Sequence, residues 1–287
     1  MSILNNFFQL SIILFLTTFS AADDLALDLA GKFFNSGDYY NSITEYKRFI
    51  FFNSNTKNDN LSYVHYKIGL AYRNQKKWQE CINAFQKSIQ TAATEGIRDE
   101  RKIALAIALI ASGHYSTAEF LLIKVEMFSR IPKLKQKAAF FRAISAVYSF
   151  KWNQAREAFH SYSINTKNES QETFKQIDSL LAEAQDVKYK SPKLAKMLST
   201  ILPGSGQIYA GDWGNGVNAL LINAATGYLF VNDVLNHQYL MAIFSSLFLF
   251  QRFYSGNKSN AEKSAKKYNE RKNQLFAAKI LEILNAK

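Results

Sequence analysis

The chain has 287 residues, of which 48% are hydrophobic, and its 35 Lys and Arg against 23 Asp and Glu give a formal net charge of +12. This length suffices for two modest domains or for a repeat array with an appendage, and the apolar fraction excludes a mostly disordered chain. Because only three prolines and twelve glycines are available to punctuate strands and turns, we expect a nearly all-helical protein.

The N-terminus has the pattern of a secretory signal over residues 1–22. A short apolar run, residues 11–19 (SIILFLTTF), is followed by the small residues Ser20, Ala21 and Ala22 and then by two aspartates. We expect cleavage after Ala22. Because the segment MSILNNFFQ that precedes the run contains no Lys or Arg, an uncleaved anchor and a buried first helix remain as alternatives.

Residues 23–163 repeat a pattern of small and aromatic residues at a shift of about 37–39 residues, a period typical of paired-helix solenoids. Small residues let the first helix of each pair approach the second, and an aromatic residue near the start of the second helix fills the gap beneath the turn. The copies are carried by Ala30, Phe33, Gly37, Tyr39, Ser42, Ile43, Tyr46 and Phe49; by Gly69, Tyr72, Trp78, Cys81, Ile82, Phe85 and Ser88; by Ala106, Leu109, Gly113, Tyr115, Ala118, Leu122 and Val125; and by Ala143, Ala146, Trp152, Ala155, Phe159 and Tyr162.

This spacing resembles the tetratricopeptide repeat, which implies an all-α, right-handed α-solenoid of about four helix pairs over 23–163, closed by a capping helix within 164–190. The Asn-rich insert 53–60 and the lack of proline at most repeat ends depart from the family pattern. The resemblance implies that the concave face, lined by the first helices, binds an extended or helical peptide. Candidate contacts, each of which is alternatively part of a solvated helix face, are Tyr63, Tyr66, Lys67, Arg73, Asn74, Arg101, Lys102 and Arg142.

Residues 191–256 are expected to form a hydrophobic helical hairpin. The segment 203–211 (PGSGQIYAG) resembles a bacterial module in which Pro-Gly-x-Gly-Gln-x-Tyr-x-Gly opens a two-helix membrane hairpin, and the stretch 254–269 matches the tail of that family. Proline should end the helix over 192–202, and the glycines permit positive φ and close backbone approach, as do Gly214 and Gly216 at the next helix start. A phosphate-binding loop is disfavoured because no Lys-Ser/Thr follows the glycines. The motif residues are Pro203, Gly204, Gly206, Gln207, Tyr209 and Gly211.

The apolar runs of this segment are too short or too polar for a simple pair of membrane spans. The second run, between Gln238 and Gln251, has about a dozen residues where about 20 are needed, and the first run carries three asparagines. Lysines flank the segment on both sides, whereas the link 232–238 has no Lys or Arg. We therefore expect a half-inserted, re-entrant hairpin with both ends at one anionic surface, and transmembrane helices as the alternative. The basic amphipathic helix over 257–287 either lies on lipid or packs against the repeats.

The sequence shows no catalytic, metal-binding or cofactor motif. The four histidines lack metal-ligand spacing, and the single cysteine, Cys81, fits a small buried hydrophobe. The positive charge suits nucleic acid, anionic lipid or an acidic protein, but no nucleic-acid recognition motif accompanies it. We expect a non-enzymatic scaffold or adaptor of the cell envelope that binds a protein or peptide partner and membrane lipid, with its repeats outside the cytoplasm. An assembly or insertion factor for membrane or secreted proteins is the alternative.

Overall fold

A computed structural model describes residues 25–53, 59–163 and 171–285, and it forms helices and turns with no strand among them. The expected signal segment lies outside these described residues. The chain divides into two compact units, Met1–Phe174 and Lys175–Lys287. The division falls inside α9 (Gln171–Gln185), the helix that covers most of the expected cap.

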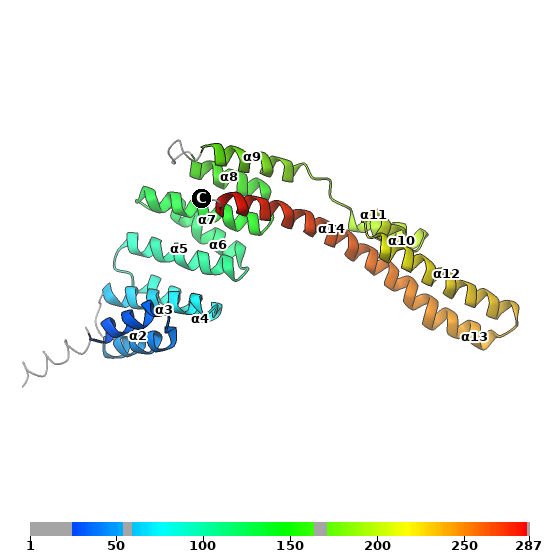
Figure 1. The fold of residues 1–287 in the computed structure, drawn as a ribbon, viewed down its shortest axis with the longest axis horizontal. Helices are drawn as coiled ribbons and strands as arrows, with labels where there is room; N and C mark the ends of the chain where they lie inside the picture. The colour runs from blue at the N-terminus through cyan, green and yellow to red at the C-terminus, as the bar shows by residue number, and fades with distance from the viewer. Residues whose placement is uncertain (1–24, 54–58, 164–170, 286–287) are drawn as a thin grey trace, which may run out of the picture. The chain divides into compact units, whose positions relative to one another are not determined.

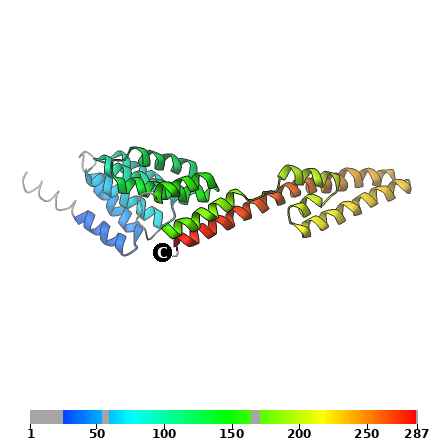
Figure 2. The same ribbon diagram turned by 90° about the horizontal axis from the view of Figure 1, so that it is seen from above.

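The first unit is a series of helix pairs in which consecutive helices pack against one another (Figure 1), as expected for a helical solenoid. Its first pair is the helix over 25–35 with α2. In Figure 2, which shows the same unit from above, the blue, cyan and green helices overlap one another. The helices are α2 (Tyr39–Asn53), α3 (Asp59–Asn74), α4 (Trp78–Gln90), α5 (Glu95–Ala111), α6 (Tyr115–Phe128), α7 (Pro132–Tyr148) and α8 (Trp152–Ser163).

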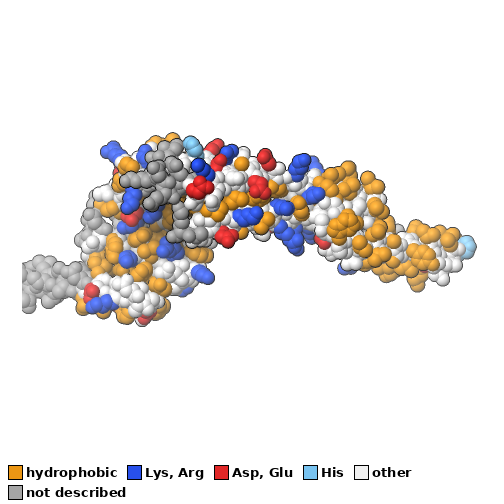
Figure 3. All heavy atoms as spheres, turned by 45° about the horizontal axis from the view of Figure 1, so that its top comes forward, with side chains coloured by type: hydrophobic (Ala, Val, Ile, Leu, Met, Phe, Trp, Pro, Cys, Tyr) orange, Lys and Arg blue, Asp and Glu red, His pale blue; other side chains and the backbone are white. Residues whose placement is uncertain are grey.

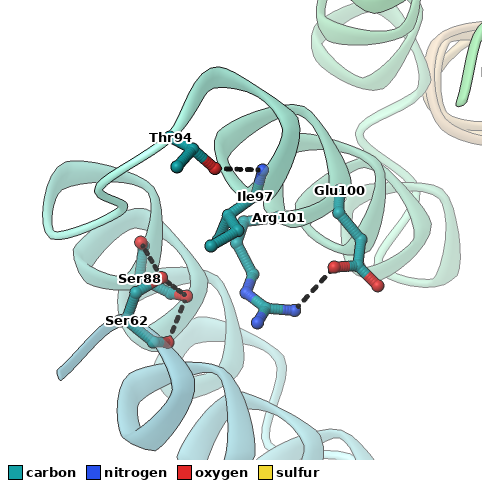
Figure 4. Close-up of polar contacts among 6 residues, drawn as sticks. All are labelled: Ser62, Ser88, Thr94, Ile97, Glu100 and Arg101. Atoms are coloured by element: carbon teal, nitrogen blue, oxygen red, sulfur yellow. Dashed lines mark hydrogen bonds and ion pairs between the residues drawn. The ribbon is translucent and has the colours of Figure 1, made fainter. Parts of the chain in front are cut away.

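Small residues hold the paired helices close together, as the repeat pattern predicts. A Cβ atom added to Gly69 in α3 would lie 2.5 Å from the ring of Phe85 in α4, so only glycine fits at this contact. Ser62 and Ser88 join the same two helices because each hydroxyl donates to the other residue's carbonyl oxygen, at 2.8 and 2.6 Å (Figure 4). Most of the pattern's other small and aliphatic residues are also buried, among them Ala30, Ala106, Ala118, Leu122, Ala143 and Ala155.

One backbone conformation ends the first helix of every pair. In all four pairs of the described residues, the residue at this turn has positive φ, and the next residue's N–H donates to the carbonyl oxygen five residues back. This bond satisfies an otherwise unpaired helix-end carbonyl. Glycine occupies the position in the first and third pairs, and lysine and phenylalanine occupy it in the others. The four residues are Gly37, Lys76, Gly113 and Phe150.

The second unit contains a helical hairpin. The long helix α12 packs antiparallel against the segment formed by α13, η2 and the start of α14 (Figures 1 and 2). His237, with a φ of 58°, makes the turn between them, again with the N–H of the next residue bonded to the carbonyl oxygen five residues back. The elements are α10 (Pro192–Ile201), α11 (Ser205–Tyr209), α12 (Trp213–Leu235), α13 (Tyr239–Phe244), the π-helix η2 (Ser245–Phe250) and α14 (Gln251–Asn285).

The C-terminal helix begins earlier than the sequence pattern indicates. It starts at Gln251 and runs without a break past Gly256, so the expected boundary at 256/257 falls inside one helix. Gly256 has open space around its α-carbon and no positive φ, and nothing there stops a helix. The expected hairpin segment and the expected basic helix are therefore continuous.

Candidate functional site

The glycines of the PGSGQIYAG motif lie where α10, α11 and α12 pack so closely that their backbones touch. This packing site is called the helical joint below. A Cβ atom on Gly204, whose φ is +91°, would lie 2.0 Å from the carbonyl oxygen of Gly216 in α12. A Cβ atom on Gly206 would lie 1.9 Å from the carbonyl oxygen of Ala195 in α10. Close approach and positive φ thus explain Gly204 and Gly206, as expected. Gly214 differs from the expectation, because no atom lies within 4 Å of an added Cβ and its φ is not positive.

Gln207 is the polar centre of this joint and is only 1% exposed. Its Nε2 donates to the carbonyl oxygen and Oδ1 of Asn257 in α14, at 3.2 and 2.9 Å. Its Oε1 accepts from the hydroxyl of Ser199 in α10 at 2.8 Å. Asn257 in turn donates to the Ser199 carbonyl oxygen at 2.9 Å and accepts from the N–H of Gly204 at 3.0 Å. Both amides are occupied by hydrogen bonds within the protein, and these bonds join α10, α11 and α14.

The outer residues of the motif also contact α14 or its neighbours. The hydroxyl of Tyr209 accepts from the N–H of Ser191 at 3.2 Å, and the Nζ of Lys190 lies 4.7 Å from the Tyr209 ring centroid. Asn269 in α14 accepts a hydrogen bond from the Lys190 N–H through its Oδ1 and donates one to the Lys190 carbonyl oxygen through its Nδ2. Gly211 has a φ of +80° at the turn into α12, and Pro203 follows Leu202, the residue that caps the end of α10. The motif and the 254–269 stretch are therefore two halves of one helical joint.

Beyond this joint the hairpin has an inverted distribution of polarity. The buried residues of α12, α13 and η2 are small or polar, namely Gly216, Asn223, Thr226, Ala242 and Ser245. The large apolar side chains point outward and are 37–84% exposed in the set Trp213, Leu220, Leu221, Tyr228, Leu229, Phe230, Val231, Leu235, Tyr239, Leu240, Met241, Ile243, Phe244, Leu247 and Phe248. Figure 3 shows hydrophobic side chains gathered over this part of the molecule, at the right of the view.

The polar groups inside the hairpin are largely paired locally. The hydroxyl of Thr226 donates to the carbonyl oxygens of Ile222 and Asn223 in its own helix, and Ser245 donates to the carboxylate of Asp233 at 3.1 Å. Asp233 is the only Asp, Glu, Lys or Arg between Asp212 and Arg252. No helix in the described part of the chain combines the length and the apolar character that a membrane crossing requires.

The start of α12 is fixed by Asp212. Its two carboxylate oxygens accept from the Asn215 side chain at 2.9 Å, and Oδ2 also accepts from the hydroxyl of Ser264 in α14 at 2.8 Å. The hydrogen bonds from Asn215 are the main reason that the pKa of Asp212 is lowered. The carboxylate thus connects the start of α12 to α14, at the opposite end of α12 from the turn at His237.

The eight candidate partner contacts all lie on the first helices of the repeat pairs, α3, α5 and α7, but several are engaged within the unit. Arg101 is only 8% exposed and its guanidinium lies 3.9 Å from the Tyr66 ring centroid. Figure 4 shows its Nη1 directed at Glu100, at 3.3 Å. Lys67 lies over the rings of Phe34 and Tyr63. The contacts of Arg101 with Tyr66 and of Lys67 with Phe34 connect successive first helices, whereas Lys67 and Tyr63 both belong to α3.

Two further candidates form ion pairs. Lys102 Nζ lies 2.9 Å from Asp99 Oδ1, and Arg142 in α7 lies 2.8 Å from the carboxylate of Glu126 in α6. Of the eight candidates, Tyr63 and Asn74 are exposed, and Arg73 is half-buried. The pattern of the sequence indicates which helices present these side chains, but not which of them are already held by neighbouring repeats.

Among the described residues no group of His, Cys, Asp and Glu is arranged to hold a metal ion. Cys81 is buried, and burial raises the pKa of its thiol to about 11. No protein-family model matches the chain, and no curated protein matches it.

Proposed function

We propose that the protein is a membrane-attached, non-enzymatic adaptor of the cell envelope, in which the hairpin embeds in lipid and the repeat array holds a protein or peptide partner. The observation that supports the proposal most strongly is the inverted polarity of the hairpin. In a water-exposed hairpin, large apolar side chains face inward and polar ones outward, whereas here Leu240 is 84% exposed and Asn223 only 6%. Small and polar residues between helices and apolar residues outside are typical of helices packed in lipid.

The energetics favour lipid contact for this surface. Transfer of one large apolar side chain from water into lipid stabilises the lipid-bound state by about 1.5–3 kcal/mol. More than a dozen such side chains are exposed on the hairpin. Burying about half a dozen of them would match or exceed the contribution of a single acyl anchor, which stabilises membrane binding by about 0.8 kcal/mol per buried CH2 group. Lysines on both sides of the hairpin would each add about 1 kcal/mol beside an anionic surface.

Flotation of the full chain with phospholipid vesicles tests the proposal. The double variant Leu240→Asp, Phe248→Asp places charges on the exposed face, so we expect at least a ten-fold loss of vesicle-bound protein, which corresponds to about 1.4 kcal/mol. Leu275→Asp is the matched control, because Leu275 is an exposed apolar residue of α14 outside the hairpin. Wild-type protein that stays with the soluble fraction, or equal loss in both variants, would contradict the proposal.

A further inference from the structure

A groove of about 510 Å³ lies in the second unit beside the helical joint, lined by α12, α14 and Gln207 of α11. Its wall is rich in side-chain amides, with Asn215, Asn218 and Asn223 contributed by α12 and Asn260 by α14. The apolar residues Ala219, Ile222 and Phe253 also line it. Because Ile222 and Phe253 are 42% and 37% exposed, the groove continues into the apolar surface of the hairpin.

The groove carries a positive charge, and one buried polar atom in its wall has no hydrogen-bond partner. Arg252 is exposed, is the one ionised residue in the lining, and forms no ion pair among the described residues. Asn223 is 6% exposed; its Nδ2 donates to the carbonyl oxygen of Ala219 at 2.8 Å, but its Oδ1 is buried without a hydrogen-bond partner. A ligand for this groove would therefore carry a negative group for the guanidinium and a hydrogen-bond donor for the amides.

We infer that this groove binds the headgroup of one anionic phospholipid, with the phosphodiester at Arg252 and the acyl chains along the apolar face of the hairpin. This inference rests on the proposed function, because contact with a bilayer supplies the lipid. A free phosphate would satisfy Arg252 but would leave the adjoining Ile222 and Phe253 exposed. A glycerol headgroup supplies hydroxyl donors to the asparagines, whereas choline has no N–H or O–H to donate.

Native mass spectrometry of the full chain in a non-ionic detergent tests the site, with phosphatidylglycerol, phosphatidylcholine and inorganic phosphate as the probes. We expect one phosphatidylglycerol to be retained per chain, with at least ten-fold weaker retention of phosphatidylcholine and no displacement by inorganic phosphate. Arg252→Gln should weaken phosphatidylglycerol retention at least ten-fold. Arg271→Gln is the matched control, because Arg271 is an exposed arginine of the same helix and lies outside the groove, and it should retain the lipid.

Equal loss in the two variants would overturn the inference, because it would show that diffuse positive charge attracts the lipid. Displacement by inorganic phosphate would overturn it as well, since the site would then take a free anion. Flotation of the wild-type chain with neutral vesicles separates this outcome from failure of the proposed function. If the chain floats but retains no lipid in detergent, only the groove inference fails; if it does not float, the hairpin proposal fails.

Discussion

Gly206 lies where the backbones of α10 and α11 touch, and its lack of a side chain is what permits the joint. In Gly206→Ala the new methyl group would be 1.9 Å from the Ala195 carbonyl oxygen, so the helices must separate and the hydrogen bonds of Gln207 must lengthen. We expect a loss of about 3 kcal/mol or more in the free energy of unfolding of the second unit. Urea denaturation followed by circular dichroism would measure it.

The control for this substitution is Gly227→Ala in α12 of the same unit. Gly227 is helical and has nothing within 4 Å of an added Cβ atom, so alanine should be neutral or stabilise the helix by about 0.5–1 kcal/mol. Similar losses in the two variants would show that the close approach at Gly206 is not what the motif requires.

Cys81 gives the first unit a predictable response to alkaline pH. Burial raises the pKa of its thiol from 9.0 to about 11, partly opposed by the nearby charge of Arg73. Below about pH 9 the thiol is protonated in both states; at higher pH the unfolded chain loses the proton first, so the free energy of unfolding falls. Burial also raises the pKa of Tyr46, to about 12, and this effect has the same sign.

Cys81→Ala separates the thiol from other titrating groups. At about pH 8 the variant should be less stable by about 1–2 kcal/mol, because a buried sulfur atom is removed. This difference should shrink as the pH rises toward about 11, since only the wild type loses the contribution of a protonated thiol. Denaturation midpoints of both proteins across this range would test the point, and a constant difference would contradict it.

At the scale of the elements, the turn inside each repeat pair depends on one left-handed residue. Gly113 has a φ of +82° and no atom within 4 Å of an added Cβ, so Gly113→Ala changes only the backbone preference and should cost about 1–2 kcal/mol. Gly31→Ala, at an equally open site within a helix, should gain about 0.5–1 kcal/mol. Thermal denaturation of the two variants should therefore show shifts of opposite sign; a shared direction would rule out this role for the turn.

The sequence predicts the helix pairs well because local rules determine them. Small residues that recur at the repeat period mark the close contacts, and Gly37 and Gly113 mark two of the four turns. The equivalent turns at Lys76 and Phe150 carry no such signal, because there the surrounding helices hold an ordinary residue in a conformation that it rarely adopts alone.

The candidate sites were harder to predict because they depend on contacts between distant residues. Gln207 and Asn257 bond directly although 50 residues separate them, and no periodic pattern connects the two positions. Arg101 looks like a binding residue in the sequence, since arginine on a helix surface usually faces solvent, yet it is buried against Tyr66. The hairpin's apolar runs are visible in the sequence, but its inverted polarity requires knowledge of which residues are buried.

At the scale of the whole molecule, the proposed function requires the array and the hairpin in one chain. A tether to the membrane confines the array near membrane-bound partners and raises their effective concentration without any new contact, an effect that reaches 10²–10⁴-fold in linked systems. The remaining candidate contact surface of the array contains Tyr63, Arg73 and Asn74, because Arg101 and Arg142 are engaged within the unit.

Crosslinking in intact cells would test whether the two parts act together. The variant Tyr63→Ala, Arg73→Glu should lose the crosslinked partner while it stays with the membrane fraction, because the exposed aromatic ring and the positive charge are removed from α3 alone. The variant Leu240→Asp, Phe248→Asp should lose at least ten-fold of the same crosslink through the lower effective concentration, and a higher expression level should restore part of it. A crosslink that survives unchanged in the hairpin variant would show that the array finds its partner without the membrane, and the adaptor proposal would then lose its reason for joining the two.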